Sequence, residues 1–105
     1  MSNTDYTVRD VLCEMGCESA VVFDNPDYDA AISGYTVDGR AVYDYDLMLR
    51  VLEIRDEMAE DEALDWLDYN TIRAIPYAGE FAPVVMTPIE NPEADALFGE
   101  EKTNA

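Results

Sequence analysis

Histidine is absent from this chain of 105 residues, and lysine occurs once, as Lys102. Without histidine, the chain has no imidazole to serve as a general base, a metal ligand or a pH switch near neutrality. Cysteine is scarce as well, because Cys13 and Cys17 are the two thiols and a structural zinc site needs four ligands. We therefore expect no enzymatic activity, no cofactor and no metal site.

Positive charge is also in short supply. The chain has 6 Lys and Arg against 24 Asp and Glu, which gives a net charge of −18. Nucleic acids and anionic membranes are both bound through basic side chains, so we expect no direct contact with either. Long apolar runs are missing and residues 1–6 are polar, which predicts a cytoplasmic protein without a signal peptide.

Apolar residues, in contrast, are plentiful. Hydrophobic residues make up 49% of the chain and aromatic residues 10%, whereas disordered chains combine high charge with few such residues. A chain of this length forms one domain at most. The sequence predicts a single α+β domain over residues 1–89, followed by a polar acidic tail over 90–105 that is mostly mobile.

The hydrophobic periodicity and the turn residues predict the elements. Asp38-Gly39 is the strongest hairpin signal, and Pro83 favours an edge position for the strand that it begins. Short turns imply an antiparallel sheet of three to four strands with helices packed on one face. The predicted order is α-β-β-β-α-α-β: a helix over 4–16, strands over 19–23, 29–36 and 40–45, helices ending near residues 58 and 74, and a strand over 83–87.

Acidic residues are concentrated in the middle of the chain. Residues 24–68 hold fourteen acids and three arginines, so this stretch alone carries a net charge of −11. Asp61, Asp65 and Asp68 have the spacing of one helical stripe, and like charges at that spacing cost a few tenths of a kcal/mol per pair. A sequence optimised for stability alone would interleave lysines with these acids.

Tyrosines accompany several of the acids, and tyrosine is a common anchor at protein interfaces. Each of these tyrosines is also explained as a half-buried residue of a strand or helix. The candidate partner-binding residues are Asp24, Asp27, Tyr28, Asp29, Asp44, Tyr45, Asp46, Glu57, Asp61, Asp65, Asp68 and Tyr69.

Three segments carry a likeness to known proteins. The run Tyr43-Asp44-Tyr45-Asp46, the stretch 65–74 and the pair Pro76-Tyr77 together resemble a group of small phage and prophage proteins. The resemblance covers about residues 20–88 and implies a mobile-element origin and an α+β fold, but no activity. Separately, size and charge are similar to those of phage-encoded anti-CRISPR and anti-restriction inhibitors, some of which mimic DNA.

These observations favour a phage-encoded inhibitor that acts in the bacterial cytoplasm. Its expected partner is a protein with a basic nucleic-acid-binding groove, such as a CRISPR effector or a restriction complex. The inhibitor is a monomer or a homodimer. The alternative is a binding or regulatory module whose acidity reflects adaptation to a salty cytoplasm, in which case the charge says nothing about a partner.

Overall fold

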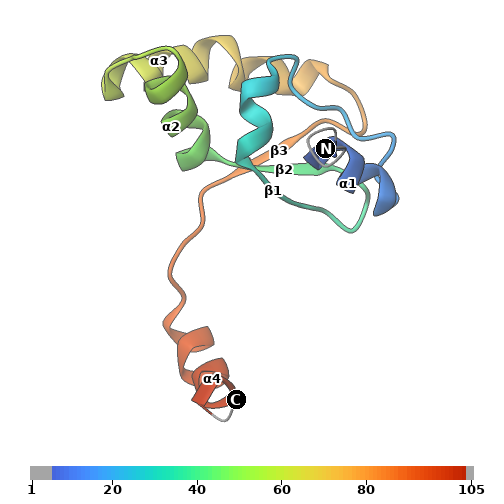
Figure 1. Cartoon of the computed structure of the whole chain (residues 1–105), viewed down its shortest axis with the longest axis vertical. Helices are drawn as coiled ribbons and strands as arrows, with labels where there is room; N and C mark the ends of the chain where they lie inside the picture. Colours follow the sequence, from blue (N-terminus) through green and yellow to red (C-terminus); the bar gives the residue numbers. More distant parts are fainter. Residues whose placement is uncertain (1–5, 104–105) are drawn as a thin grey trace.

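The computed structural model describes residues 6–103 and has the α+β class expected from the sequence (Figure 1). A three-stranded sheet is combined with α-helices and 3-10 helices. The elements are α1 (Val8–Glu14), η2 (Pro26–Ala31), β1 (Ile32–Tyr35), β2 (Ala41–Asp44), α2 (Tyr45–Arg55), α3 (Glu60–Asn70), η3 (Ile72–Tyr77), β3 (Val84–Met86) and α4 (Pro92–Thr103).

The sheet has the order β1-β2-β3, with β2 in the centre. β1 and β2 form the expected antiparallel hairpin, in which Tyr35 pairs with Ala41. Gly39 supplies the positive φ of +88° that the turn requires. β3 lies at an edge, as the proline before it predicts.

The pairing of β3 corrects the prediction of a purely antiparallel sheet. β3 runs parallel to β2, with Val42 opposite Val84 and Asp44 opposite Met86. Parallel neighbours need a long crossover connection, and here α2, α3 and η3 lie between the two strands in the chain. The sheet is therefore mixed, because the crossover returns the chain to the starting end of β2.

Two of the predicted strands are also corrected. Residues 19–23 form a loop rather than a strand. Isolated hydrogen bonds hold this loop, such as the one from the Val21 N–H to the Phe81 carbonyl oxygen at 3.0 Å. The first half of the predicted strand 29–36 is the 3-10 helix η2, because Asn25 caps it and Pro26 occupies its first turn. Only the second half remains as β1.

The core lies between the sheet and the helices α2, α3 and η2. Tyr43 of β2, Met48 and Leu52 of α2, and Ala63 and Leu67 of α3 are fully buried. The inward residues of both helices recur at a spacing of four, which places them on one face of each helix. In Figure 1, α2, α3 and η3 gather on one side of the sheet.

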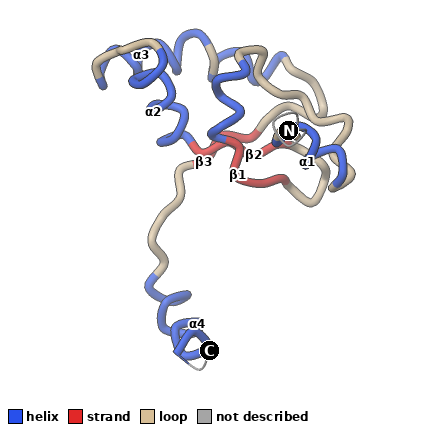
Figure 2. Tube along the Cα trace, viewed as in Figure 1, coloured by secondary structure: helices blue, strands red, loops and turns tan. Residues whose placement is uncertain are grey.

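α4 stands apart from the rest of the fold. Figure 2 shows an extended segment leading away from β3 to this helix, which Asn91 caps through the Glu93 N–H at 3.0 Å. The radius of gyration is 16.1 Å, against about 13 Å for a compact domain of this length. The tail expected over 90–105 therefore contains a helix, and its mobility stays a prediction.

Candidate functional site

The outward side of α3 carries the predicted acidic stripe. Ala63 and Leu67 face the core, and the carboxylates of α3 project away from it into solvent. Since residues three and four apart share one helix face, a continuous acidic surface results. This surface, called the acidic α3 face below, consists of Asp61, Glu62, Asp65 and Asp68.

The segment that carries the acidic α3 face contains no basic residue. Between residues 56 and 68 there are seven acids and no lysine or arginine. In the part of the chain that the structure describes, the ion pairs are Arg9–Asp29 and Arg55–Asp27, neither of which involves α3. Asp61 to Asp68 spans about 10.5 Å at 1.5 Å per residue, so the acidic α3 face concentrates negative charge along one axis.

Two predicted site residues meet where α2 begins. The Tyr45 hydroxyl donates a hydrogen bond to Asp68 Oδ1 at 3.1 Å, which ties α2 to α3. Burial, followed by this bond to a carboxylate, raises the pKa of Tyr45 above its ordinary value. Tyr45 therefore positions Asp68 and remains a neutral hydrogen-bond donor at physiological pH.

Tyr69 is the most exposed of the three candidate tyrosines, at 69%. The Arg73 guanidinium lies 4.9 Å from the centroid of its ring, within the range of a cation–π contact. Both residues line a shallow hollow of about 380 Å³ with Asp65 and Asp68. One basic side chain thus already lies beside the acidic α3 face.

Tyr28 does not serve as the interface anchor that its position between two aspartates suggested. It is 3% exposed and its ring packs edge-on against Phe23, with the centroids 6.0 Å apart. The 3-10 geometry of η2 turns this side chain into the core while Asp24 and Ala30 stay outside. Tyr28 therefore stabilises the fold, and the small part of it that stays exposed lines a pocket shared with Trp66.

Three other predicted carboxylates have intramolecular partners. Asp29 accepts two hydrogen bonds from Arg9, at 2.9 and 3.0 Å, and these bonds raise the pKa of Arg9. Asp27 lies 3.9 Å from Arg55. Asp44 caps α2 by accepting the Leu47 N–H at 3.1 Å. Each therefore has a role in the fold that is independent of any partner.

The remaining predicted acids are Asp24, Asp46 and Glu57, which are all exposed. Asp46 lies in the first turn of α2, where its charge favours the helix dipole. Glu57 lies in the loop between α2 and α3 with a φ of 56°, which residues other than glycine rarely adopt. Asp24 lines a cavity together with Trp66, which is partly exposed.

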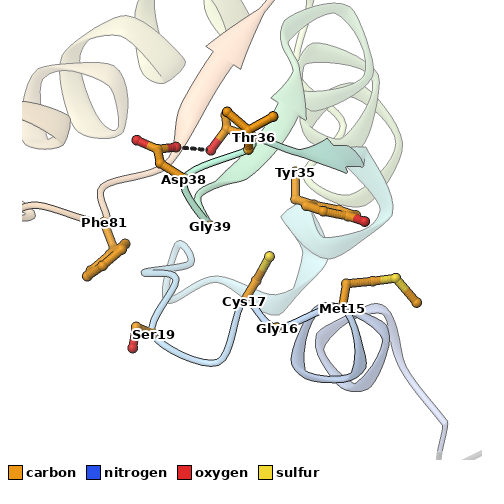
Figure 3. A pocket seen from close by; sticks show the side chains of 10 residues that line it. Met15, Gly16, Cys17, Ser19, Tyr35, Thr36, Asp38, Gly39 and Phe81 are labelled. Atoms are coloured by element: carbon orange, nitrogen blue, oxygen red, sulfur yellow. Dashed lines mark hydrogen bonds between the residues drawn. The ribbon is translucent and has the colours of Figure 1, made fainter.

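A cavity of about 310 Å³ lies between the end of α1, the β1–β2 turn and Phe81 (Figure 3). Its lining includes the buried Cys17, together with Ser19 and Asp38, and it contains no predicted site residue. Asp38 accepts a hydrogen bond from the Thr36 hydroxyl, drawn in Figure 3, which stabilises the turn. Asp38 and Thr36 thus have a local structural role in this turn.

Within residues 6–103, no three cysteine, aspartate or glutamate side chains lie close enough together to hold a metal ion. No helix in the same range is long and apolar enough to cross a bilayer.

Comparison with known proteins identifies no relative. No family model, no curated protein and no solved structure matches this chain. The likeness to phage proteins therefore stays a prediction from sequence, and the functional argument depends on the geometry alone.

Proposed function

We propose that this chain is a phage-encoded inhibitor that occupies the basic nucleic-acid-binding groove of a host defence complex, of the CRISPR-effector or restriction type, and thereby blocks DNA binding. The observation that carries the proposal is the acidic α3 face, a row of carboxylates on the outward side of one helix that forms no ion pair within the described part of the chain. The inhibitor acts in the cytoplasm of the bacterial host and performs no chemistry on its target.

The spacing of the carboxylates supports mimicry of a phosphate backbone. Asp61, Asp65 and Asp68 place three negative charges within about 10.5 Å of helix axis. One DNA strand carries about one phosphate per 3.4 Å, so three phosphates span about 6.8 Å of its axis. The three carboxylates are therefore spaced somewhat more widely than phosphates, but within the reach of long arginine and lysine side chains.

The overall charge supports fast, salt-sensitive association. A protein with a net charge of −18 is attracted to a basic groove over distances of a Debye length, about 10 Å at 0.1 M salt. Raising the ionic strength shortens that range and weakens each exposed pair. A decoy of this kind therefore competes best with DNA at low salt.

A DNA-binding competition tests the proposal. The protein is titrated into CRISPR effector complexes and restriction enzymes that hold labelled target DNA, at low and at moderate salt. We expect one complex to lose its DNA, and we expect Asp61→Asn, Asp65→Asn and Asp68→Asn combined to weaken this effect at least tenfold. Three exposed pairs at about 0.5 kcal/mol each make up the 1.4 kcal/mol of a tenfold change.

The matched control removes the same amount of charge away from α3. Glu18, Glu80 and Glu90 are exposed, and changing all three to Gln leaves the same net charge as the α3 variant. This control should weaken the competition less than threefold. If no complex releases DNA, or if both triple variants behave like the unmodified chain, the decoy proposal is wrong.

A second candidate function has one observation in its favour. Exposed acids also occur outside α3, among them Asp10 and Glu14 on α1 and Glu93 and Asp95 on α4. Such a spread is typical of a surface adapted to high salt, on which acidity does not identify a partner. A binding or regulatory module of this kind would leave every complex in the competition bound to its DNA.

A further inference from the structure

A pocket lies between the loop that precedes η2 and the C-terminal half of α3. It encloses about 320 Å³ and its lining includes Phe23, Asp24, Tyr28, Trp66, Asn70 and Thr71. This pocket is called the Trp66 pocket below. Its volume is at the small end of the range for ligand sites, about 300–1,000 Å³, and so it suits one long side chain better than a drug-sized molecule.

Aromatic rings form the walls of the Trp66 pocket. Phe23 and Tyr28 meet edge-on at 6.0 Å with an interplanar angle of 71°, and they are held on the side of the core. Trp66 is 47% exposed, so part of its ring system is open to solvent. Indole is the strongest aromatic partner for a cation, and a planar guanidinium stacks on such a ring.

Hydrogen-bond acceptors lie beside these rings. Asp24 is the charged residue of the lining, and among the side chains of residues 6–99 no ion pair engages its carboxylate. Asn70 donates its Nδ2 to the Trp66 carbonyl oxygen at 3.1 Å, which leaves the amide oxygen as an acceptor. The pocket thus combines a cation-binding ring with a carboxylate and a neutral acceptor.

A basic side chain of the protein itself does not fill the pocket. Arg9 is the nearby cation, since it donates to the Phe23 carbonyl oxygen at 3.1 Å, but it is held by the Asp29 carboxylate and does not line the cavity. Arg9 interacts with Asp24 only at longer range, as one of the smaller causes of the raised pKa of Arg9, and forms no ion pair with it. The Asp24 carboxylate can therefore pair with a cation from another molecule.

We propose that the Trp66 pocket binds one arginine side chain of the protein partner, with the guanidinium stacked on Trp66 and paired with Asp24. Arginine fits better than lysine because its planar group offers five donors and stacks on an aromatic face. The net charge of −18 attracts an arginine-bearing surface. For the class of partner, this inference rests on the proposed function.

Trp66 makes the test direct, because it is the one tryptophan of the chain. Its fluorescence is followed while the full chain is titrated with acetyl-Gly-Arg-Gly-amide at constant ionic strength. The same peptide with lysine, or with uncharged citrulline, replaces it in parallel titrations. We expect a saturable change with the arginine peptide and at least fivefold weaker binding of the other two.

Two single variants locate the binding. Asp24→Asn should weaken the arginine peptide at least fivefold, whereas Asp95→Asn, which removes the same charge from α4, should leave the affinity unchanged. The thermal unfolding of both variants is measured by circular dichroism, so that a loss of binding is not mistaken for a loss of fold. The citrulline comparison requires no variant and tests the charge requirement independently.

Three results would overturn the inference. Equal binding of the citrulline peptide would mean that the pocket takes neutral ligands. Equal weakening by Asp24→Asn and Asp95→Asn would mean that diffuse charge attracts the peptide. A signal that rises without saturation would mean that no site exists.

The peptide titration contains no defence complex, so its outcome is separate from that of the DNA competition. Arginine binding without any effect on DNA complexes would support the arginine site in the Trp66 pocket and contradict the decoy proposal. The opposite result is a successful DNA competition that Asp24→Asn does not change, together with no binding of the arginine peptide. That result would contradict the arginine site and support the decoy proposal.

Discussion

At the scale of single residues, Tyr43 connects the sheet to the loop that precedes η2. Its side chain is fully buried, and its ring lies 4.7 Å from that of Phe23 between centroids. Its hydroxyl accepts the Phe23 N–H at 3.1 Å. One side chain thus fills the core and also accepts a hydrogen bond from the backbone of a segment that belongs to no strand.

Tyr43 should make the stability fall at alkaline pH. Burial raises the pKa of Tyr43 in the folded state, while the unfolded chain keeps a tyrosine pKa near 10. The folded state therefore holds the proton more tightly, and its stabilising contribution is complete below pH 10 and is lost as the pH rises through the folded pKa. Urea unfolding at pH 8, 10 and 11 measures this loss.

The variant Tyr43→Phe separates the two roles of the hydroxyl. We expect it to lower the free energy of unfolding at pH 8 by about 1 kcal/mol, because a buried N–H loses its acceptor. It should also reduce the loss of unfolding free energy above pH 10. Tyr77→Phe is the matched control, since Tyr77 is 90% exposed. An equal alkaline decline in the unmodified chain and in Tyr43→Phe would contradict this account.

At the scale of elements, side-chain caps mark where α1, η2, α2 and α4 begin, whereas α3 and η3 start without one. Thr7 and Asp10 form a reciprocal capping box at α1, and Asn25 and Asn91 cap η2 and α4. Two aspartates, Asp44 and Asp46, lie where α2 begins. The structure assigns the cap to Asp44, because β2 ends there and the chain turns directly into the helix.

Asp44→Ala should therefore cost about 1 kcal/mol of unfolding free energy, which is typical of a lost N-cap. Asp44→Asn retains the acceptor and should cost no more than a few tenths. Asp46→Ala removes a charge from the same turn without removing the cap, so its cost should also stay below that of Asp44→Ala. Chemical unfolding of the three variants at pH 7 ranks them, and an equal cost for Asp44→Ala and Asp46→Ala would refute the assignment.

At the scale of the whole molecule, the body of the fold and α4 are distinct. The extended segment after β3 carries α4 away from the sheet in Figure 1. On α4, Leu97 and Phe98 are more than half exposed. Because the core residues all precede residue 86, the body has the contacts that it needs without the tail.

Ending the chain at residue 89 should thus change the unfolding free energy by no more than about 0.5 kcal/mol, as expected of surface changes. The truncation also removes five acids and one lysine, which relieves some self-repulsion. Urea unfolding is therefore measured in 0.5 M NaCl, because the salt screens the charge repulsion and leaves the contribution of packing to the unfolding free energy. A loss above 1 kcal/mol would mean that α4 stabilises the body.

The sequence by itself determined the features that depend on neighbours within a few residues. The hairpin at Asp38-Gly39, the edge position after Pro83 and the helices with acidic outer faces follow from turn chemistry and periodicity. The outward direction of Asp61, Asp65 and Asp68 belongs here, since Ala63 and Leu67 define the inward face locally.

Only the tertiary structure decided the features that depend on distant pairs. The parallel register of β2 and β3 joins residues more than forty positions apart. The hydrogen bonds from Arg9 to Asp29 and from Tyr45 to Asp68 join residues about twenty positions apart. The burial of Tyr28 depends on contacts of the same kind. The Trp66 pocket is of the same kind, because it forms where the loop before η2 meets α3. Local propensity carries no information about such pairs, since they are selected by how the whole core packs.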